Sequence, residues 1–303
     1  MTSPSVSVIL PTYNRAALLP RAIHSVLNQS YRDLELVVVD DCSNDGTEQE
    51  LSKIRDPRLR MIRQTVNSGP SAARNAGIRA STGHYVAFQD SDTEWSPEKL
   101  RKQIELLEQR DENGTYPAAC YSRFIILRGN KKIVVPSDPK NTLCGHIYER
   151  LLYGNTMDTP SIVLRREVLN MIGDFDESLA NLEDWDLALR VSLNHSIVFL
   201  DEITLNSHDS PGSVNKLLSP ESLITILHKH YDSYRAFPKA MANITWRIGY
   251  EYAMLQRRAE ALHYMKKSLE QLSTPKRSLQ FTALRGGLIP YKALLYCRKL
   301  LRP

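Results

Sequence analysis

The chain has 303 residues, of which 42% are hydrophobic and 24% are charged. This composition is typical of a folded globular protein and argues against a disordered chain, which would contain fewer apolar residues. No run approaches the roughly 18 apolar residues of a membrane-spanning helix. The N-terminus also lacks the basic and apolar regions of a secretory signal, so we expect a cytoplasmic location.

The net charge of +5 conceals two regions of opposite balance. Residues 215–303 carry 16 Lys and Arg against 5 Asp and Glu, whereas residues 1–214 carry 23 against 29. Opposite balances indicate two different roles. We therefore place a boundary near residue 215.

Short apolar runs alternate with helix-like segments through the first part of the chain. We expect strands at 6–10, 34–39, 59–62 and 85–88, and helices at 16–27, from residue 47, and at 71–80. Strands that are apolar throughout and alternate with helices indicate a sheet covered on both faces. The predicted fold is α/β, with a single, mostly parallel, twisted, Rossmann-like sheet.

The later elements are less regular. A long amphipathic helix is expected from Ser96 to about Arg110, and a hairpin over 118–135 turning at 128–130. Residues 145–208 mix helices with short strands, including a helix that begins near Glu183. Beyond Pro220 the pattern is almost wholly helical.

Polar residues follow three of the predicted strands. They are Pro11-Thr12-Tyr13-Asn14-Arg15, Asp40-Asp41 and Gln89-Asp90-Ser91-Asp92. In parallel α/β sheets, ligands bind outside the carboxyl ends of the strands. These segments therefore mark the predicted ligand site.

The pair Asp90 and Asp92 suggests a metal site. Two carboxylates on a tight turn can share a hard divalent cation, which stabilises a diphosphate leaving group. A polar turn between a strand and a helix is the structural alternative. Asp40 and Asp41 also have a functional and a structural interpretation. They can accept hydrogen bonds from a base or ribose, or they can lie near a helix N-terminus, where acids are favourable.

Four further side chains are candidates. Arg74, near the predicted ligand edge, suits planar recognition of phosphate or base oxygens, or it is a solvated surface residue. A carboxylate at Glu183-Asp184 can serve as general base, although acids also favour the first turn of a helix. His208 can be a metal or phosphate ligand, or merely a packed histidine.

Several familiar catalytic motifs do not occur in the sequence. We find no phosphate-binding Gly-x-x-x-x-Gly-Lys-Ser/Thr loop, no Gly-x-Gly-x-x-Gly motif and no Gly-x-Ser-x-Gly elbow. This argues against a P-loop hydrolase, a nicotinamide dehydrogenase and an α/β-hydrolase.

Five segments, in order, resemble the family 2 glycosyltransferases. They are Val8–Arg15, Val37–Thr47, Ser71–Ile78, Phe88–Asp92 and Glu183–Leu187. The resemblance covers roughly residues 5–215 and implies the glycosyltransferase A fold and an inverting, metal-dependent transferase that uses a nucleotide-sugar donor. Within residues 1–215 it implies a donor part over about 1–95 and an acceptor part over 96–215, followed by a helical basic extension over 216–303.

The resemblance also implies roles for individual residues. Pro11, Thr12, Tyr13, Asp40, Asp41, Arg74 and Asp90 would contact the donor, Asp92 with Asp90 and His208 would hold Mn²⁺ or Mg²⁺, and Asp184 would be the base with Glu183 beside it. Three positions depart from the usual pattern. Gln89 replaces an apolar residue, Thr93 replaces an acid, and Asn206-Ser207 stands where an Arg is frequent.

The C-terminal segment 272–303 contains seven Lys and Arg and no acid, interleaved with apolar residues. Such a pattern predicts a basic amphipathic helix that lies on an anionic membrane surface, which would suit a lipid-linked acceptor at the inner face of the cell membrane. Packing on its own domain and a dimer contact are the alternatives. Nucleic-acid binding is not expected, because no binding module accompanies the charge.

A UDP-sugar is the expected donor, with GDP- and dTDP-sugars as alternatives. The expected acceptor is a saccharide or lipid-linked saccharide, in bacterial cell-surface polysaccharide or lipopolysaccharide synthesis. A catalytically silent nucleotide-sugar-binding or scaffold protein of the same fold is the alternative, and intact Asp92 and Asp184 argue against it. A sugar nucleotidyltransferase is disfavoured because its Gly-rich basic N-terminal loop is missing from the sequence.

Overall fold

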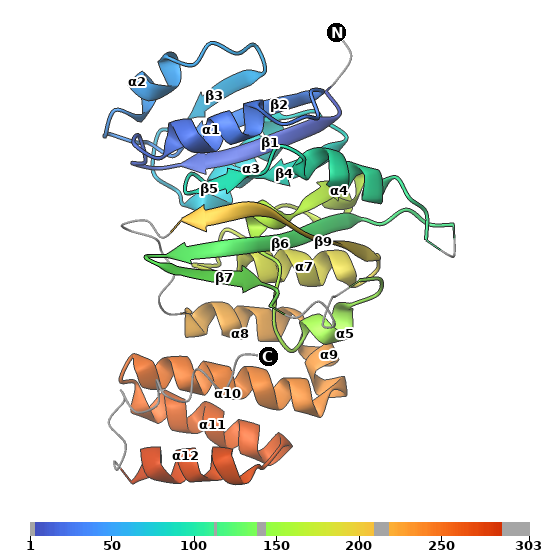
Figure 1. Cartoon of the computed structure of the whole chain (residues 1–303). Helices are drawn as coiled ribbons and strands as arrows, with labels where there is room; N and C mark the ends of the chain where they lie inside the picture. Colours follow the sequence, from blue (N-terminus) through green and yellow to red (C-terminus); the bar gives the residue numbers. More distant parts are fainter. Residues whose placement is uncertain (1–3, 112–113, 138–143, 209–217, 287–303) are drawn as a thin grey trace. The chain divides into compact units, whose positions relative to one another are not determined.

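The computed structural model describes residues 4–111, 114–137, 144–208 and 218–286. The chain divides into two compact units (Figure 1). The first comprises 1–148, 155–177 and 183–213, and the second comprises 149–154, 178–182 and 214–303.

The first unit is built on a nine-stranded sheet with the order β3-β2-β1-β4-β8-β6-β9-β5, and β7 pairs with β6. The strands are β1 (Val6–Thr12), β2 (Leu34–Asp40), β3 (Leu59–Arg63), β4 (Tyr85–Phe88), β5 (Thr93–Trp95), β6 (Ala119–Arg128), β7 (Lys131–Val135), β8 (Val163–Arg165) and β9 (Ile197–His208). All four strands predicted in the first part of the chain are present, as is the hairpin of β6 and β7.

The expectation of a mostly parallel sheet is correct only for β3, β2, β1 and β4, which pair in parallel. The other strands form a mixed sheet, in which β6 and β9 are parallel and four pairs are antiparallel. One antiparallel pair follows from the tight β6–β7 turn, which cannot join parallel strands. The three-residue strand β8 was too short to be recognised in the sequence, although it reverses the strand direction beside β4.

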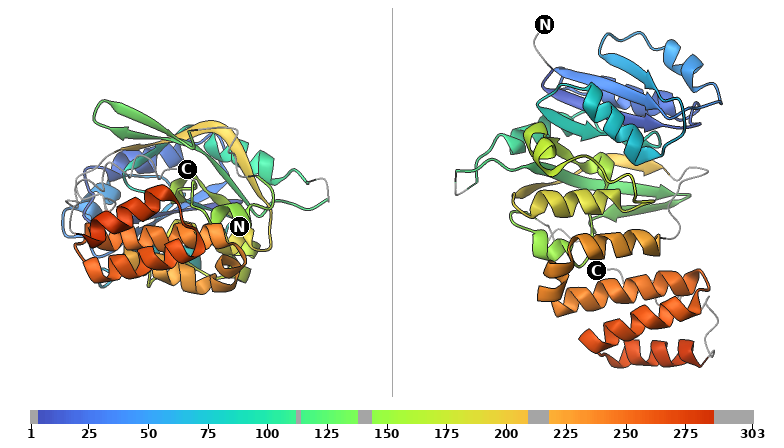
Figure 2. Two further views of the ribbon diagram at one scale, coloured as in Figure 1. Left: turned by 90° about the horizontal axis from the view of Figure 1, so that it is seen from below. Right: turned by 180° about the vertical axis from the view of Figure 1, so that it is seen from behind.

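Helices cover both faces of the sheet, as predicted. They are α1 (Leu19–Leu27), α2 (Thr47–Ser52), α3 (Pro70–Ala80), α4 (Lys99–Leu107), α6 (Arg166–Ile172) and α7 (Glu183–Ser192), with a 3₁₀ turn η2 at Thr159–Ser161. The short helix α5 (Tyr148–Leu151) belongs mostly to the second unit. The buried core on one face joins Val6, Val8 and Leu10 of β1 to the apolar side of α1. The helix α3 packs against the other face, and the views from front and behind show the two helices on opposite sides of the strands (Figures 1 and 2).

A glycine sets the close approach of α3 to the sheet. A Cβ atom on Gly77 would lie 2.4 Å from Cγ2 of Ile9 on β1 and 3.1 Å from Cγ2 of Val39 on β2. Because no side chain fits there, α3 lies close to these two strands, with Arg74 one turn before the contact.

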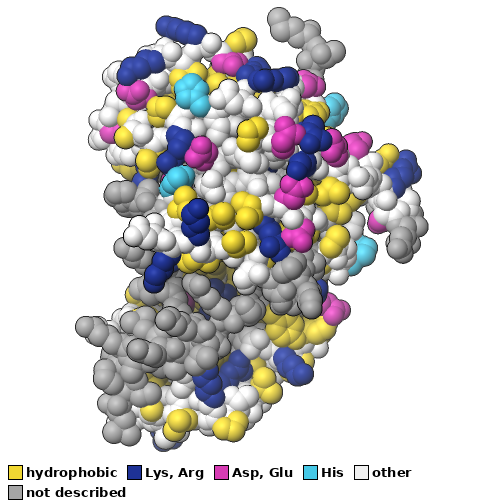
Figure 3. All heavy atoms as spheres, in the orientation of Figure 1, with side chains coloured by type: hydrophobic (Ala, Val, Ile, Leu, Met, Phe, Trp, Pro, Cys, Tyr) yellow, Lys and Arg dark blue, Asp and Glu magenta, His cyan; other side chains and the backbone are white. Residues whose placement is uncertain are grey.

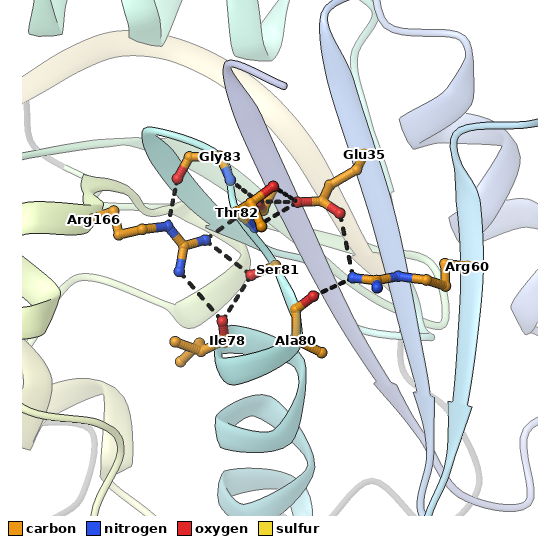
Figure 4. Close-up of polar contacts among 9 residues, drawn as sticks. Glu35, Arg60, Ile78, Ala80, Ser81, Thr82, Gly83 and Arg166 are labelled. Carbon is orange, nitrogen blue, oxygen red and sulfur yellow. Dashed lines mark hydrogen bonds and ion pairs between the residues drawn. The ribbon is translucent and has the colours of Figure 1, made fainter. Parts of the chain in front are cut away.

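A polar network fixes the end of α3 and the starts of β1, β2 and β4 (Figure 4). The guanidinium of Arg166 donates to the carbonyl of Ile78 at 3.3 Å and to Oγ of Ser81 at 2.9 Å. Glu35 accepts from Oγ of Ser7 at 2.7 Å and from the backbone N–H of Thr82 at 2.8 Å. This network lies at the amino ends of the parallel strands and leaves their carboxyl ends for a ligand.

The second unit is helical in its described part, as predicted beyond Pro220. It contains α8 (Pro220–Lys229), α9 (Tyr231–Ala236), α10 (Pro238–Met254), α11 (Arg258–Gln271) and α12 (Pro275–Arg285). A Cβ atom on Gly249 of α10 would lie 2.7 Å from Cγ of Met265 on α11, so the glycine allows these two helices to pack closely. Figure 3 shows Lys and Arg side chains on the visible face of these helices.

None of the helices in the described ranges is long and apolar enough to cross a membrane. Residues 287–303, which hold most of the predicted basic amphipathic helix, lie outside the described residues.

Candidate active site

The carboxyl ends of β1, β2 and β4 meet at one edge of the sheet. Thr12 pairs with Asp40, and Ile9 pairs with Phe88, the last residue of β4. The loops that follow are joined by hydrogen bonds, because the backbone N–H of Asn14 donates to Oγ of Ser43 at 2.9 Å. The polar segments singled out in the sequence are therefore adjacent in space.

The two predicted donor-binding acids after β2 also support the loops around them. Both carboxylate oxygens of the buried Asp41 accept backbone N–H groups from the loop before α3, those of Ser68 at 2.9 Å and Gly69 at 2.8 Å. Asp40 is fully buried, and its Oδ1 accepts the N–H of Ser43 at 3.0 Å. Their contact with a donor stays a prediction.

The predicted donor residues at and just beyond the end of β1 differ in exposure. Pro11 is half-buried, Thr12 is buried, and the ring of Tyr13 is 43% exposed. Oγ1 of Thr12 is buried without a hydrogen-bond partner in the part of the chain that the structure describes. An unpaired buried hydroxyl costs free energy, and a ligand or water at this edge can offset that cost.

Arg74 joins the turn that contains Asp90 to the start of α7. Its guanidinium lies 2.9 Å from Oδ1 of Asp90 and 2.8 Å from Oε1 of Glu183. Burial alone would lower the pKa of Arg74, but attraction by the two carboxylates outweighs burial and raises it. The alternative of a solvated surface arginine is thus wrong, because only 5% of this side chain is exposed.

The guanidinium also contacts an aromatic ring and retains one unpaired donor. It lies 5.5 Å from the centre of the Phe175 ring, which packs edge-on against Phe88. Nε of Arg74 is buried without a hydrogen-bond partner among the described residues. A planar cation held in this way can present that donor to an oxygen of a ligand.

Gln89 and Thr93, which both depart from the family pattern, are hydrogen-bonded to each other across the Asp-x-Asp turn. Oγ1 of Thr93 donates to Oε1 of Gln89 at 2.5 Å, and Nε2 of Gln89 donates to the carbonyl of Thr93 at 3.1 Å. Both side chains are buried. The amide and the hydroxyl thus close the turn that carries Asp90 and Asp92, which accounts for both departures together.

The start of α7 contributes the predicted base. Oδ1 of Asp184 accepts the backbone N–H of Trp185 at 2.7 Å. Burial raises the pKa of Asp184 well above its usual range, and the negative charges of Glu183 and Asp158 raise it further. A carboxylate with a raised pKa is a stronger base, which suits proton abstraction from a hydroxyl. Asp186 is paired at 2.8 Å with Arg190, which lies four residues later on the same helix.

The pairing of β5 with β9 places His208 beside the Asp-x-Asp turn. The backbone N–H of His208 donates to the carbonyl of Asp92 at 3.0 Å. Its imidazole Nε2 lies 3.6 Å from Oε2 of Glu94 and has no hydrogen-bond partner among the described residues. The metal-ligand role of His208 stays a prediction.

The side chains at this edge are of the type that a hard divalent cation binds. Carboxylates of Asp90, Asp92, Asp158, Glu183 and Asp184 influence one another here, and Arg74 is the cation that acts on Asp158 and Asp184. An excess of carboxylate oxygens fits Mg²⁺ or Mn²⁺. In the described residues, no three His, Cys, Asp or Glu side chains are already grouped as a metal site.

Asp158 was not singled out in the sequence. It directly precedes η2, in a region that no motif covers. Burial raises the pKa of Asp158 to about 7, with further upward contributions from Asp90, Glu183 and Asp92 that exceed the lowering by Arg74. Only the antiparallel placement of β8 beside β4 brings this residue to the site, so no local sequence signal could have identified it.

Solved structures share this fold. Residues 1–349 of S. aureus TarS, in complex with UDP-GlcNAc, match with a TM-score of 0.70 and 20% identity, over 98% of this chain and 92% of that one. The mannosyltransferase PcManGT from Pyrobaculum calidifontis, in complex with GDP-Man and Mn²⁺, matches with a TM-score of 0.61 and 20% identity, over 99% and 86%. The fold is therefore the glycosyltransferase A fold.

Sequence comparison gives the family. The model of glycosyl transferase family 2 matches residues 7–169. The Escherichia coli (strain K12) glycosyl transferase WcaA, which is named for colanic acid biosynthesis, is 30% identical over 242 residues, which cover 77% of this chain and 83% of that protein. The chain belongs to glycosyl transferase family 2.

Proposed function

We propose that the protein is an inverting glycosyltransferase that moves a sugar from a nucleotide-sugar, specifically a UDP-sugar, to an acceptor hydroxyl. The observation that carries this proposal is the double ion pair of Arg74 with Asp90 and Glu183, at 2.9 and 2.8 Å. It joins the Asp-x-Asp turn to the helix that begins with the predicted base. In this proposal, the turn that binds the donor and the base that acts on the acceptor therefore belong to one site.

In the proposed reaction, Asp184 takes the proton of the acceptor hydroxyl. The acceptor oxygen then forms a bond to the anomeric carbon while the bond from that carbon to the diphosphate oxygen breaks. The raised pKa of Asp184 suits this transfer, because the carboxylate holds the proton more firmly than an ordinary aspartate.

Asp92 and Asp90, with His208, would hold a divalent cation, which would neutralise charge on the leaving nucleoside diphosphate. Arg74 positions Asp90 and keeps Glu183 beside the base. The loop residues Pro11, Thr12, Tyr13, Asp40 and Asp41 would enclose the nucleotide at the carboxyl ends of β1 and β2.

The biological setting we propose is the assembly of a bacterial surface polysaccharide. Support comes from the relative named for colanic acid biosynthesis and from the excess of Lys and Arg in residues 215–303. That charge would suit a lipid-linked saccharide acceptor and peripheral attachment to the inner face of the cell membrane.

A first experiment separates this proposal from a catalytically silent binding protein. We expect thermal unfolding with UDP, GDP, dTDP and CMP, each with and without Mn²⁺, to show a metal-dependent stabilisation by one nucleotide. A ligand at about 100 times its dissociation constant stabilises by roughly 2.7 kcal/mol. If no nucleotide stabilises the folded protein, the assignment of a donor site is wrong.

A second experiment tests the base. Asp184→Asn should retain nucleotide binding and lose sugar transfer by a factor of about 100 or more. Asp174→Asn is the matched control, because Asp174 is a partly exposed acid paired with Arg79 at 3.2 Å. Normal turnover by Asp184→Asn would remove it as the base, whereas binding without turnover in the unmodified protein would favour a silent scaffold.

A further inference from the structure

The segment before β8 runs along the carboxyl end of β4. The two strands are antiparallel, with Tyr85 opposite Arg165 and Ala87 opposite Val163. Residues that precede Val163 therefore lie beside residues that follow Phe88. This register brings Asp158 to the turn that contains Asp90 and Asp92, although more than sixty positions separate them in the sequence.

Local hydrogen bonds fix the backbone around Asp158. The side chain of Asn155 accepts the N–H of Met157 at 3.0 Å and donates to its carbonyl at 2.7 Å. Both the backbone N–H and Oγ of Ser161 donate to the carbonyl of Asp158, at 2.8 and 2.7 Å. The main chain on both sides of Asp158 is thus held in one conformation.

The buried side chains of Gln103 and Lys99 support the turn η2. Nε2 of Gln103 donates to the carbonyl of Ser161 at 2.9 Å, and Nζ of Lys99 donates to Oε1 of Gln103 at 2.6 Å. Neither Lys99 nor Gln103 has any exposed surface. Burying an amide and an amine costs free energy, which their mutual hydrogen bond and the contact with Ser161 offset. A buried hydrogen-bond network therefore holds η2 in position.

We propose that Asp158 is a substrate-binding residue that accepts a hydrogen bond from a sugar hydroxyl in the transferase site. As a residue Asp158 is partly exposed, and the acids of the Asp-x-Asp turn and of the first turn of α7 are close enough to interact with it electrostatically. A carboxylate near both the predicted metal-binding turn and the predicted base suits a hydroxyl of the donor sugar or of the acceptor sugar.

This inference rests on the proposed function. Asp158 is also the N-cap residue of η2, where it forms a capping box with Ser161. A carboxylate placed among other carboxylates is unfavourable unless a donor group approaches it. Sugar hydroxyls supply such donors, and a hydrogen bond to a charged acceptor is stronger than one between neutral groups.

The test uses the full-length protein with Mn²⁺ and UDP-glucose, UDP-galactose or UDP-N-acetylglucosamine, with p-nitrophenyl glycosides as acceptors. Asp158→Asn and Asp158→Ala are compared with the unmodified protein and with Asp174→Asn. We expect kcat/KM for transfer to fall about 10- to 100-fold in the Asp158 variants. The affinity for UDP should stay within about twofold. The melting temperature of Asp158→Asn should be unchanged, because asparagine can replace aspartate as the N-cap of η2.

The two sources of the hydroxyl give different patterns. If the donor sugar provides it, the UDP-sugar binds more weakly while UDP binds normally. If the acceptor provides it, donor affinity and donor hydrolysis are unchanged while the KM of the acceptor rises. Either pattern supports the inference.

Other outcomes overturn it. Normal kcat/KM for the Asp158 variants, in a protein that transfers sugar, refutes this inference and leaves the proposed function intact. A joint loss of activity, UDP binding and melting temperature shows that Asp158 has only a structural role. If the unmodified protein neither binds nor hydrolyses any of these nucleotide-sugars, the proposed function fails and this inference fails with it.

Discussion

The side chain of Arg74 shows how one cation organises an acidic site. It is almost fully buried and makes two ion pairs, with Asp90 and Glu183. Removing a buried partner leaves uncompensated charge, which costs more than the pair itself contributes. We therefore expect the position of this residue to affect both stability and catalysis.

The substitution Arg74→Lys tests whether the site requires a planar guanidinium that contacts Asp90 and Glu183 at the same time. Lysine carries the same charge but presents it at a single point, so it cannot hold Asp90 and Glu183 in this fork. We expect kcat/KM to fall at least tenfold and stability to fall by about 1–3 kcal/mol, measured by steady-state kinetics and urea unfolding. Wild-type values for both would show that charge alone is sufficient.

The pH dependence of transfer reports on the base. Burial and then Glu183 raise the pKa of Asp184, so activity should increase as pH rises through a value above that of an ordinary aspartate. Glu183→Gln removes one negative charge and frees Arg74 to act on Asp184. Both effects lower the pKa of Asp184, so the acidic limb of the plot of kcat/KM against pH should move to lower pH. A limb that moves upward or stays in place would contradict this assignment.

A buried lysine gives a second pH prediction, on stability. Burial lowers the pKa of Lys99 from 10.5 to about 7. Between these values the unfolded chain binds the proton and the folded chain does not, so stability rises with pH, by at most roughly 1.4 kcal/mol per pH unit. Lys99→Met lacks this dependence. Its stability relative to the wild type should be greatest near pH 7 and decline toward pH 10, and a constant difference in urea unfolding would refute the prediction.

At the scale of elements, the packing of α3 on β1 and β2 determines where Arg74 lies. Gly77 permits this packing because a Cβ atom would meet Ile9 and Val39. The sequence predicted α3 but not the reason for its glycine, since that reason is a contact with two strands far away in the chain.

Gly77→Ala should therefore reduce stability by about 1–3 kcal/mol through overpacking and should also reduce kcat/KM by shifting Arg74. The double variant with Ile9→Ala removes the side chain that the new methyl group would contact at 2.4 Å. The two changes should then cost less together than the sum of the single changes. Strict additivity in urea unfolding would show that the helix does not press on Ile9.

At the scale of the whole chain, positive charge is concentrated in the C-terminal segment. Seven Lys and Arg occur without an acid in residues 272–303, of which the structure describes 272–286. Each basic residue near an anionic surface contributes about 1 kcal/mol, and salt screens the attraction. Membrane association therefore stays a prediction of the sequence.

Co-sedimentation with vesicles tests it. We expect binding to vesicles that contain phosphatidylglycerol, little binding to phosphatidylcholine alone, and loss of binding near 0.5 M salt. Lys276→Glu with Lys292→Glu should weaken it, and Lys53→Glu with Lys131→Glu, both in the acidic N-terminal region, is a control of equal charge change. Absence of binding to anionic vesicles would favour packing on the same chain or a dimer contact.

The sequence by itself determined the family and the longer helices and strands up to residue 135. Apolar runs such as 34–39 are strands because they are buried on both faces, and the motif residues follow those strands directly. A polar group at a strand end can be recognised without knowing the rest of the fold.

Only the tertiary structure decided which acids meet and what holds them. Arg74, Asp90 and Glu183 come from three separate segments, and Asp158 reaches the site through a three-residue strand whose direction no local pattern reveals. Strand register and burial are long-range properties of the folded chain. The pKa values of Asp184 and Lys99 depend on them, because they arise from desolvation and from neighbours distant in the sequence.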